Sequence, residues 1–202
     1  MRNRLCLFVL AVAAAGVPTT LGAQSAPVCM KGKPDSPVRV DVYSDYECPS
    51  CGAFFLQTMQ SVFKDYADTG KACVVYRDFP LKVHEHALEA AHYARAAQHV
   101  SPQLWAKVAE ALFRAQAKWS KDGNLDGAVA AILDSKEMDT LREALDDNSL
   151  YDAIGDDIQE GEAQGVEDAP TVIISGKNGT EEIEGALRYS ALKPRLDSAL
   201  GE

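Results

Sequence analysis

The chain has 202 residues and carries 20 basic against 30 acidic side chains, a formal net charge of −10. This acidic balance argues against nucleic acid or an anionic membrane surface as a partner. The surplus is concentrated between Asp134 and Asp168, where 13 acids accompany only Lys136 and Arg142. We interpret that run as a solvated helical face that keeps the protein soluble.

The first 23 residues are typical of a secretory signal peptide. Arg2 and Arg4 form a basic region, and the apolar run from Leu5 to Val17 is too short to span a membrane comfortably. Ala23 is a small residue suited to cleavage; an uncleaved N-terminal anchor is the alternative. Cleavage near Ala23 predicts an exported, periplasmic protein of about 179 residues, long enough for one domain with a sizeable core.

Residues 24–37 are expected to be an irregular lead-in, with a short edge strand near Val28. A strand is predicted from Val38 to Ser44, and a helix follows from Pro49 or Ser50 to Ala67. The apolar residues of this helix recur at three- to four-residue spacing, namely Phe55, Met59, Val62 or Phe63, and Tyr66. They predict one buried stripe.

Ala72 to Phe79 predicts a second strand, which Pro80 closes. Helical patterns follow without an internal repeat, and we interpret residues 84–164 as an all-helical insertion, not a second domain. The predicted segments are His84 to His99, a helix capped by Ser101-Pro102, Leu125 to Leu133, Met138 to Leu145, and Leu150 to Gly161.

The strand pattern returns late in the chain. Thr171 to Ser175 and Thr180 to Glu184 flank a turn at residues 176–179. Tyr189 to Leu200 is expected to close the chain as a helix that Pro194 kinks or shortens. The predicted order is β-α-β, then helices, then β-β-α, an α/β fold with a mixed central sheet.

The motif Cys48-Pro49-Ser50-Cys51 lies between the first strand and its helix. This order places Cys48 at a helix N-terminus, where free N–H groups and the positive end of the helix dipole stabilise a thiolate. Cys51 lies one turn deeper, close enough to resolve a mixed disulfide on Cys48. Pro49 suits the first turn because its missing N–H costs nothing there. The chemistry predicted is dithiol–disulfide exchange.

Four cysteines remain once Cys6 leaves with the signal peptide, and an even number in an exported protein favours disulfides. Three pairings are possible. With Cys48 and Cys51 as the redox pair, Cys29 and Cys73 are left for a structural bridge from the lead-in to the second strand. A second redox couple is the alternative, but nothing close in sequence activates either sulfur.

A C-x-x-C motif can also be half of a zinc site. His84 and His86 are candidates for further ligands by residue type alone; their spacing is poor for joint ligation, and no second C-x-x-C exists. We interpret both histidines as ordinary polar residues near a helix start. No metal or organic cofactor is expected.

The sequence resembles the DsbA-like branch of the thioredoxin superfamily over nearly the whole mature chain, and the predicted element order is the thioredoxin order with an insertion. The segments that carry the resemblance are Tyr43 to Cys51, Tyr76 to Leu81 with His86, Ala87, Ala90 and Ala91, Leu104-Trp105 with Leu112-Phe113, and Gly165 to Thr171. The resemblance implies a thioredoxin-like domain over residues 38–202.

The resemblance also implies substrate-binding residues. Pro170 is expected to be cis and to pack against the cysteine pair, and Ala169 to offer backbone hydrogen bonds to an extended substrate peptide. Pro49 and Ser50 complete the expected groove. One departure is Ala169, where family members usually carry Thr or Val; backbone contacts survive that change.

A second departure concerns proton transfer. Many relatives carry a buried acid six residues before the first cysteine, where this chain has Val42. Proton transfer to Cys51 is then left to Asp41, Asp45, Glu47 or water.

Negative charge near Cys48 opposes thiolate formation, and Asp45, Glu47 and Asp168 are all expected there. The helix terminus acts in the other direction. A less stabilised thiolate makes a less oxidising couple. We therefore expect a milder oxidant than the strongest members of the family.

The sequence predicts an exported, monomeric thiol–disulfide oxidoreductase that donates its Cys48–Cys51 disulfide to reduced secreted proteins. The resemblance implies reoxidation by a membrane quinone-linked partner. One alternative is the same chemistry run as a reductase. Another is a redox-inert binding module with a permanent 48–51 bridge. An isomerase is disfavoured because the lead-in is too short for a dimerisation domain.

Overall fold

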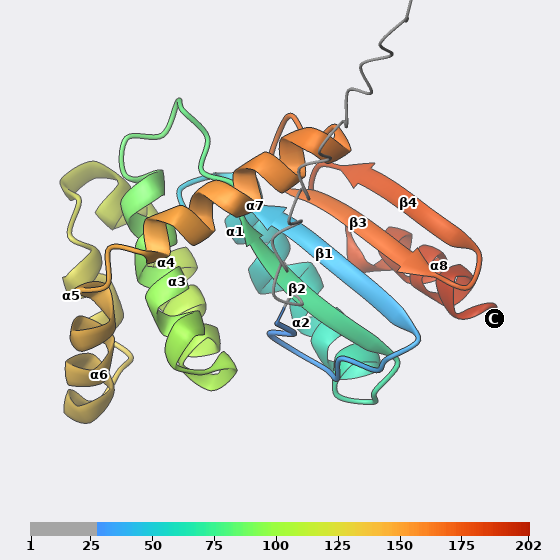
Figure 1. Ribbon diagram of the computed structural model, residues 1–202, viewed down its shortest axis with the longest axis horizontal. Helices are drawn as coiled ribbons and strands as arrows, with labels where there is room; N and C mark the ends of the chain where they lie inside the picture. Colours follow the sequence, from blue (N-terminus) through green and yellow to red (C-terminus); the bar gives the residue numbers. More distant parts are fainter. Residues whose placement is uncertain (1–27) are drawn as a thin grey trace, which may run out of the picture.

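The computed structural model describes residues 28–202 and places them in one mixed sheet with flanking helices (Figure 1). The predicted signal peptide lies outside the described residues. The strands are β1 (Val38–Ser44), β2 (Ala72–Asp78), β3 (Thr171–Gly176) and β4 (Gly179–Glu184). The helical segments are α1 (Pro49–Ala53), η1 (Phe54–Met59), α2 (Gln60–Val62), η2 (Phe63–Ala67), α3 (Ala87–Val100), α4 (Pro102–Asp122), α5 (Leu125–Ala130), α6 (Ser135–Leu145), α7 (Leu150–Gln164) and α8 (Tyr189–Leu200). Within residues 28–202, no helix is long and apolar enough to cross a membrane.

The sheet has the order β2-β1-β3-β4, with β1 parallel to β2 and antiparallel to β3. Ser44 at the end of β1 pairs with Asp78 at the end of β2, and Tyr43 pairs with Thr171 at the start of β3. Three connections therefore meet where β1 and β2 end and β3 begins: the turn into α1, the loop into α3 and the loop that precedes β3. This is the mixed sheet and thioredoxin-like order that the sequence predicts.

β1 lies in the interior of the molecule, although its apolar residues alternate with Arg39 and Asp41. Val40, Val42 and Tyr43 are fully buried, because α2 and α8 lie behind the sheet and α7 crosses in front of it (Figure 1). β4 is the opposite case. It forms one edge of the sheet and exposes Glu181 and Glu182, and such charges discourage pairing with another chain.

The helix predicted to run to Ala67 is continuous but irregular, because η1 and η2 are π-helical. A π-helical turn holds an extra residue, so it brings adjacent side chains to the same face. Both residues of the pairs Phe54–Phe55 and Val62–Phe63 are buried. The predicted stripe is buried in full, and it is wider than an ideal α-helix would make it.

α3 begins at Ala87, three residues after the predicted start. The backbone N–H of Leu81 donates to the Asp45 carboxylate over 2.8 Å, and that of His86 donates to Glu47 over 2.6 Å. These two bonds hold residues 79–86 as a loop against the turn that follows β1. Tertiary contacts therefore delay the helix beyond what its alanine- and leucine-rich sequence suggests.

Two other helix boundaries follow local signals. α6 starts at Ser135 because Asp134 and Glu137 form a reciprocal capping box. α7 does not end at Gly161 but continues to Gly165, whose φ of 93° suits the left-handed cap. Gly161 instead allows close packing, since an added Cβ would lie 2.8 Å from an aromatic ring of β1.

α8 runs through Pro194 over its full predicted length instead of being shortened. It packs beside the helix that follows β1. The Tyr66 hydroxyl donates to the Asp197 carboxylate over 2.5 Å, and the Thr58 hydroxyl donates to the Leu187 carbonyl over 2.8 Å. These contacts fix the helix that carries the cysteine motif against the C-terminal end of the chain.

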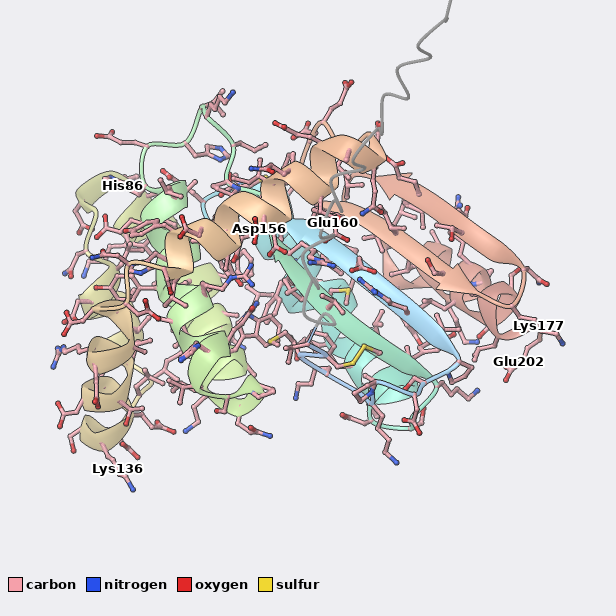
Figure 2. The ribbon with its side chains drawn as sticks, in the orientation of Figure 1. His86, Lys136, Asp156, Glu160, Lys177 and Glu202 are labelled. Carbon is pink, nitrogen blue, oxygen red and sulfur yellow. A yellow bond between two sulfur atoms is a disulfide. The ribbon has the colours of Figure 1, made fainter. Side chains whose placement is uncertain are left out.

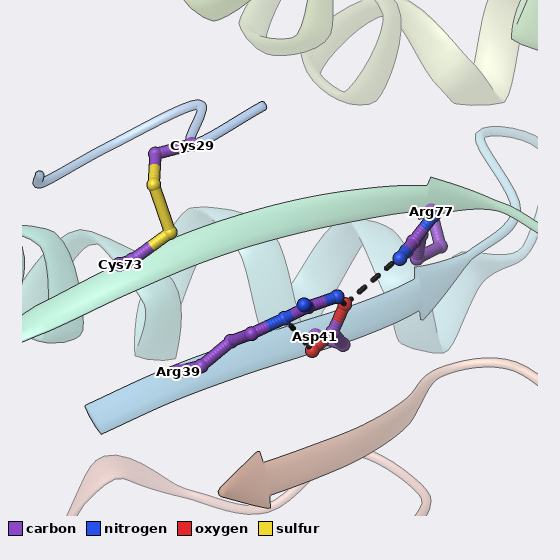
Figure 3. Close-up of a disulfide and its surroundings, with 5 residues drawn as sticks. All are labelled: Cys29, Arg39, Asp41, Cys73 and Arg77. Atoms are coloured by element: carbon purple, nitrogen blue, oxygen red, sulfur yellow. Dashed lines mark hydrogen bonds and ion pairs between the residues drawn. A yellow bond between two sulfur atoms is a disulfide. The ribbon is translucent and has the colours of Figure 1, made fainter. Parts of the chain in front are cut away.

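The lead-in forms no strand at Val28. A single antiparallel bridge pairs Lys31 with Val74 of β2, and a disulfide joins Cys29 to Cys73 (Figure 3). The lead-in is thus tied to the start of β2, at the end of that strand remote from the cysteine motif.

An ionic cluster joins β2 to the helical insertion. Arg77 of β2 contacts Asp157 over 2.7 Å and Glu160 over 3.1 Å, both on α7. Arg95 of α3 contacts Asp78 over 2.6 Å and also pairs with Asp157. Buried charges require such partners, so the cluster fixes how α3 and α7 sit on the sheet.

A candidate active site at the end of β1

Cys48 is the N-cap of α1 and has an extended backbone, with φ −75° and ψ 121°. Its N–H donates to the Asp45 carbonyl over 3.2 Å, and its own carbonyl accepts the N–H of Gly52 over 3.1 Å. Cys51 lies one turn further along. Both are free thiols; 7% of Cys48 and 1% of Cys51 is exposed. Cys48 is therefore the more exposed residue of the pair.

Several donors surround the Cys48 sulfur. Hydrogen bonding from Cys51 is the largest influence; partial burial opposes it, and the Ser50 hydroxyl at 2.9 Å and the backbone N–H groups of Ser50 and Cys51 add to it. Together they lower the Cys48 pKa to about 5. At neutral pH Cys48 is therefore a thiolate, the form that attacks disulfides and leaves from them.

Cys51 has the opposite environment. Burial raises its pKa far above the ordinary value, and its hydrogen bond to Cys48 and the charge of Cys48 act in the same direction. The backbone N–H of Asp45 lies 3.5 Å from the Cys51 sulfur. The pair can thus hold one proton on Cys51 and one negative charge on Cys48.

The loop before β3 covers the pair from the other side. The Ala169–Pro170 peptide bond is cis, and the Ala169 carbonyl oxygen lies 3.5 Å from the Cys48 sulfur. The Ala169 N–H donates to the Asp168 carboxylate over 2.7 Å, and Thr171 donates its hydroxyl to the Asp168 carbonyl over 2.7 Å. The structure thus brings Ala169 and Pro170 together with the cysteines, and leaves Pro49 and Ser50 exposed at the rim.

The acids expected near Cys48 are largely engaged elsewhere. The Asp45 carboxylate accepts bonds from the N–H of Glu47 and of Leu81 and from His84 Nδ1, and Glu47 accepts from the backbone of His86. The leading influences on the Cys48 pKa are the hydrogen bonds and burial described above, not these carboxylates. Their expected opposition to thiolate formation is therefore weaker than the sequence suggests.

Asp41 does not face the cysteines. Its carboxylate pairs with Arg39 over 2.6 Å and Arg77 over 3.2 Å (Figure 3). Among the acids considered for proton transfer, only Asp45 touches Cys51, and it does so through its backbone N–H.

Gln116 of α4 is a site residue that sequence reasoning missed. Its Nε2 donates to the Tyr46 carbonyl over 2.7 Å and to the Cys48 carbonyl over 2.9 Å. The helical insertion thus holds the backbone of the motif directly. No signal in the sequence marks Gln116, because its two partners lie far away in the chain.

A thioredoxin family model matches residues 24–197, most of the chain. The chain belongs to the thioredoxin family. Its sheet carries a helical insertion, and its fold is similar to that of solved DsbA proteins.

Three comparisons illustrate the likeness. The disulfide bond formation protein D of Bacillus subtilis is 26% identical over 176 residues, which cover 84% of this chain and 75% of that protein. Crystal structures of BdbD from Bacillus subtilis and of Pseudomonas aeruginosa DsbA2 are each 22% identical, with TM-scores of 0.70 and 0.69. The former covers 88% of this chain and 100% of BdbD, and the latter 89% and 97%.

The two histidines considered as zinc ligands have other contacts. His84 lies 2.7 Å from the Asp45 carboxylate, and His86 stands where α3 begins (Figure 2). In residues 28–202, no group of three or more His, Cys, Asp or Glu side chains is arranged to hold a metal. His84 is thus more than an ordinary polar residue, as its contact with Asp45 indicates.

Proposed function

We propose that this DsbA-like thiol:disulfide oxidoreductase donates the Cys48–Cys51 disulfide to reduced exported proteins. The observation that supports this proposal most is that the two thiols have very different pKa values. The Cys48 pKa is about 5, whereas burial raises the Cys51 pKa. Oxidising power comes from stabilising the reduced form, and a stabilised Cys48 thiolate does that.

In the proposed first step, a substrate thiolate attacks the Cys48 sulfur of the oxidised pair. The bond between the two enzyme sulfurs breaks, and Cys51 leaves and takes up a proton. A mixed disulfide now joins the substrate to Cys48. Ala169 and Pro170 would position the substrate backbone beside that sulfur, with Pro49 and Ser50 at the rim.

In the second step, another substrate thiolate attacks the substrate sulfur of the mixed disulfide. Cys48 leaves as a thiolate, which its surrounding donors stabilise. Two electrons have then passed from the substrate to the enzyme, and the substrate has gained a disulfide. An oxidant must remove those electrons again, and we infer a membrane quinone-linked partner on the exported side, after cleavage near Ala23.

The reductase alternative uses the same sulfurs. The Bacillus relatives bear the name disulfide bond formation protein D, which favours the oxidising direction. The Cys48 pKa of about 5 lies between the values of about 7 in thioredoxin and about 3.5 in the most acidic member of this class. We therefore expect an oxidant of intermediate strength.

The test is the reduction potential of the pair, obtained by equilibration with glutathione buffers and trapping of free thiols. A value clearly above that of the glutathione pool supports a disulfide donor. A value near that of thioredoxin favours the reductase. Absence of any exchange between the pair and glutathione contradicts both, and leaves a binding module.

A further inference from the structure

Asp45 is a buried acid at the centre of the site. It is 1% exposed, and its carboxylate accepts three hydrogen bonds: from the N–H of Glu47 at 2.7 Å, from the N–H of Leu81 at 2.8 Å, and from His84 Nδ1 at 2.7 Å. His84 is the only one of these donors that can carry a positive charge. A buried carboxylate is stable when such a charge accompanies it, so the pair favours the imidazolium form of His84.

The backbone of Asp45 contacts both cysteines of the motif, Cys48 through its N–H and Cys51 through its sulfur. Its carbonyl accepts the N–H of Cys48 over 3.2 Å, and its N–H lies 3.5 Å from the Cys51 sulfur. One residue thus connects His84, on the loop between β2 and α3, to the redox pair. A change in the charge of His84 therefore acts on Asp45, whose backbone is in direct contact with the cysteines.

The charges around His84 come from two segments. Asp45, in the turn after β1, contacts it directly, and the charges of Cys48 and Glu47 in the same turn also act on it; Lys82, Glu85 and His86 flank it on its own loop. Partial burial lowers the pKa of His84, but the hydrogen bond and charge of Asp45, followed by the charges of Cys48 and Glu47, outweigh it and raise the pKa. Attraction between charges is mutual, so the imidazolium stabilises the Cys48 thiolate in return.

We propose that His84 is a positioning residue for the redox pair: held by Asp45, its imidazolium supplies the positive charge that stabilises the Cys48 thiolate. The motif itself cannot supply that charge, because Pro49 and Ser50 are neutral. The thiolate exists in the reduced enzyme and not in the disulfide. The charge of His84 therefore favours the reduced form and makes the disulfide a stronger oxidant. This inference deepens the proposed function and rests on it.

The experiment compares His84→Gln with His86→Gln, a matched control from the same loop. The His86 side chain makes no hydrogen bond to Asp45 or Glu47, and its backbone N–H, which does contact Glu47, is retained in the control. For each variant the Cys48 pKa is measured from the pH dependence of alkylation, and the reduction potential from glutathione equilibration.

We expect His84→Gln to raise the Cys48 pKa by about one unit and to lower the potential by about 30 mV, which corresponds to a tenfold change in equilibrium constant. His86→Gln should leave both at wild-type values. His84→Lys, which restores a cation without the imidazole ring, should recover part of the shift. A residue that only supports the loop would not show this rescue by charge.

Wild-type values of both quantities in His84→Gln overturn the inference. If His84→Gln does not fold, His84→Lys decides the matter: a Cys48 pKa less than a full unit above the wild-type value supports the charge, and one raised by a full unit or more contradicts it. Failure of the proposed function looks different, because the wild-type pair would then exchange no disulfide with glutathione. A wild-type enzyme that exchanges, beside an unaffected His84→Gln, rejects this inference alone.

Discussion

The protein contains two cysteine pairs at opposite ends of the parallel strands, and their surroundings differ. Cys48 and Cys51 are three residues apart in a helical turn, with hydroxyl and backbone donors aimed at one sulfur. Cys29 and Cys73 are 44 residues apart and are joined in a disulfide that ties the lead-in to β2 (Figure 3).

The difference shows what makes a cysteine pair reactive. A sulfur becomes a good leaving group when donors stabilise its thiolate, and the turn at the start of α1 provides them. Cys73 instead lies within the strand β2, not at the first turn of a helix. We therefore propose exchange chemistry for the first pair and a structural role for the second. Four predictions test this contrast.

The largest expected effect is the loss of exchange in Cys48→Ser, because no other reachable thiolate can form the mixed disulfide. Cys51→Ser should instead accumulate the mixed disulfide, since the resolving sulfur is missing. Both are measured by mass spectrometry after mixing the reduced variant with a glutathione-linked peptide, whose disulfide the Cys48 thiolate attacks with release of glutathione. The control is the double variant Cys29→Ser with Cys73→Ser, which should still exchange. Exchange by Cys48→Ser at the wild-type rate contradicts the assignment.

The second prediction concerns the bridge. Removing both Cys29 and Cys73 should lower the free energy of unfolding by about 2–5 kcal/mol, because a crosslink over 44 residues restricts the unfolded chain. Urea unfolding of the variant and of the wild type, both with a reduced motif, measures it. The reduction potential of Cys48–Cys51 should not change. A shift in that potential would make the second pair part of the redox machinery.

The third prediction is a pH dependence that only one pair should show. Cys48 has a folded pKa of about 5 against an ordinary value of 9.0, so between these values the unfolded chain binds more protons than the folded one. The free energy of unfolding of the reduced protein should therefore rise as pH increases from about 5 towards 9. The contribution of Cys48 to that free energy shrinks as pH falls and is lost as pH falls through 5. The raised pKa of Cys51 has no effect below 9.

The oxidised protein is the control for this pH dependence, because its Cys48 carries no thiol to titrate. Urea unfolding of both forms at several pH values should show that, as pH rises, the free energy of unfolding of the reduced form increases relative to that of the oxidised form. Parallel pH profiles for the two forms would contradict a stabilised thiolate at Cys48.

The contrast between the pairs was largely predictable because its main determinants are local. Strand, C-x-x-C and helix are contiguous in sequence, so the position of Cys48 at a helix N-terminus follows from periodicity alone. The cis bond before Pro170 was expected from a family resemblance. The contacts of His84 with Asp45 and of Gln116 with Cys48 span 39 and 68 residues, and local patterns contain no information on such pairings. They depend on how the insertion packs against the sheet.

The smallest predicted effect tests that long-range support. Gln116→Leu removes two hydrogen bonds to the backbone of the motif and leaves the Tyr46 and Cys48 carbonyls without their side-chain donor. We expect a loss of about 1–3 kcal/mol in unfolding free energy and less than a tenfold change in the exchange equilibrium, because the donors to the Cys48 sulfur remain. Lys118→Ala, an exposed change two residues along α4, is the control and should affect neither.

A Gln116→Leu variant with wild-type stability would mean that the insertion covers the motif without holding it. A tenfold or larger change in exchange would make Gln116 a determinant of the potential, comparable to His84.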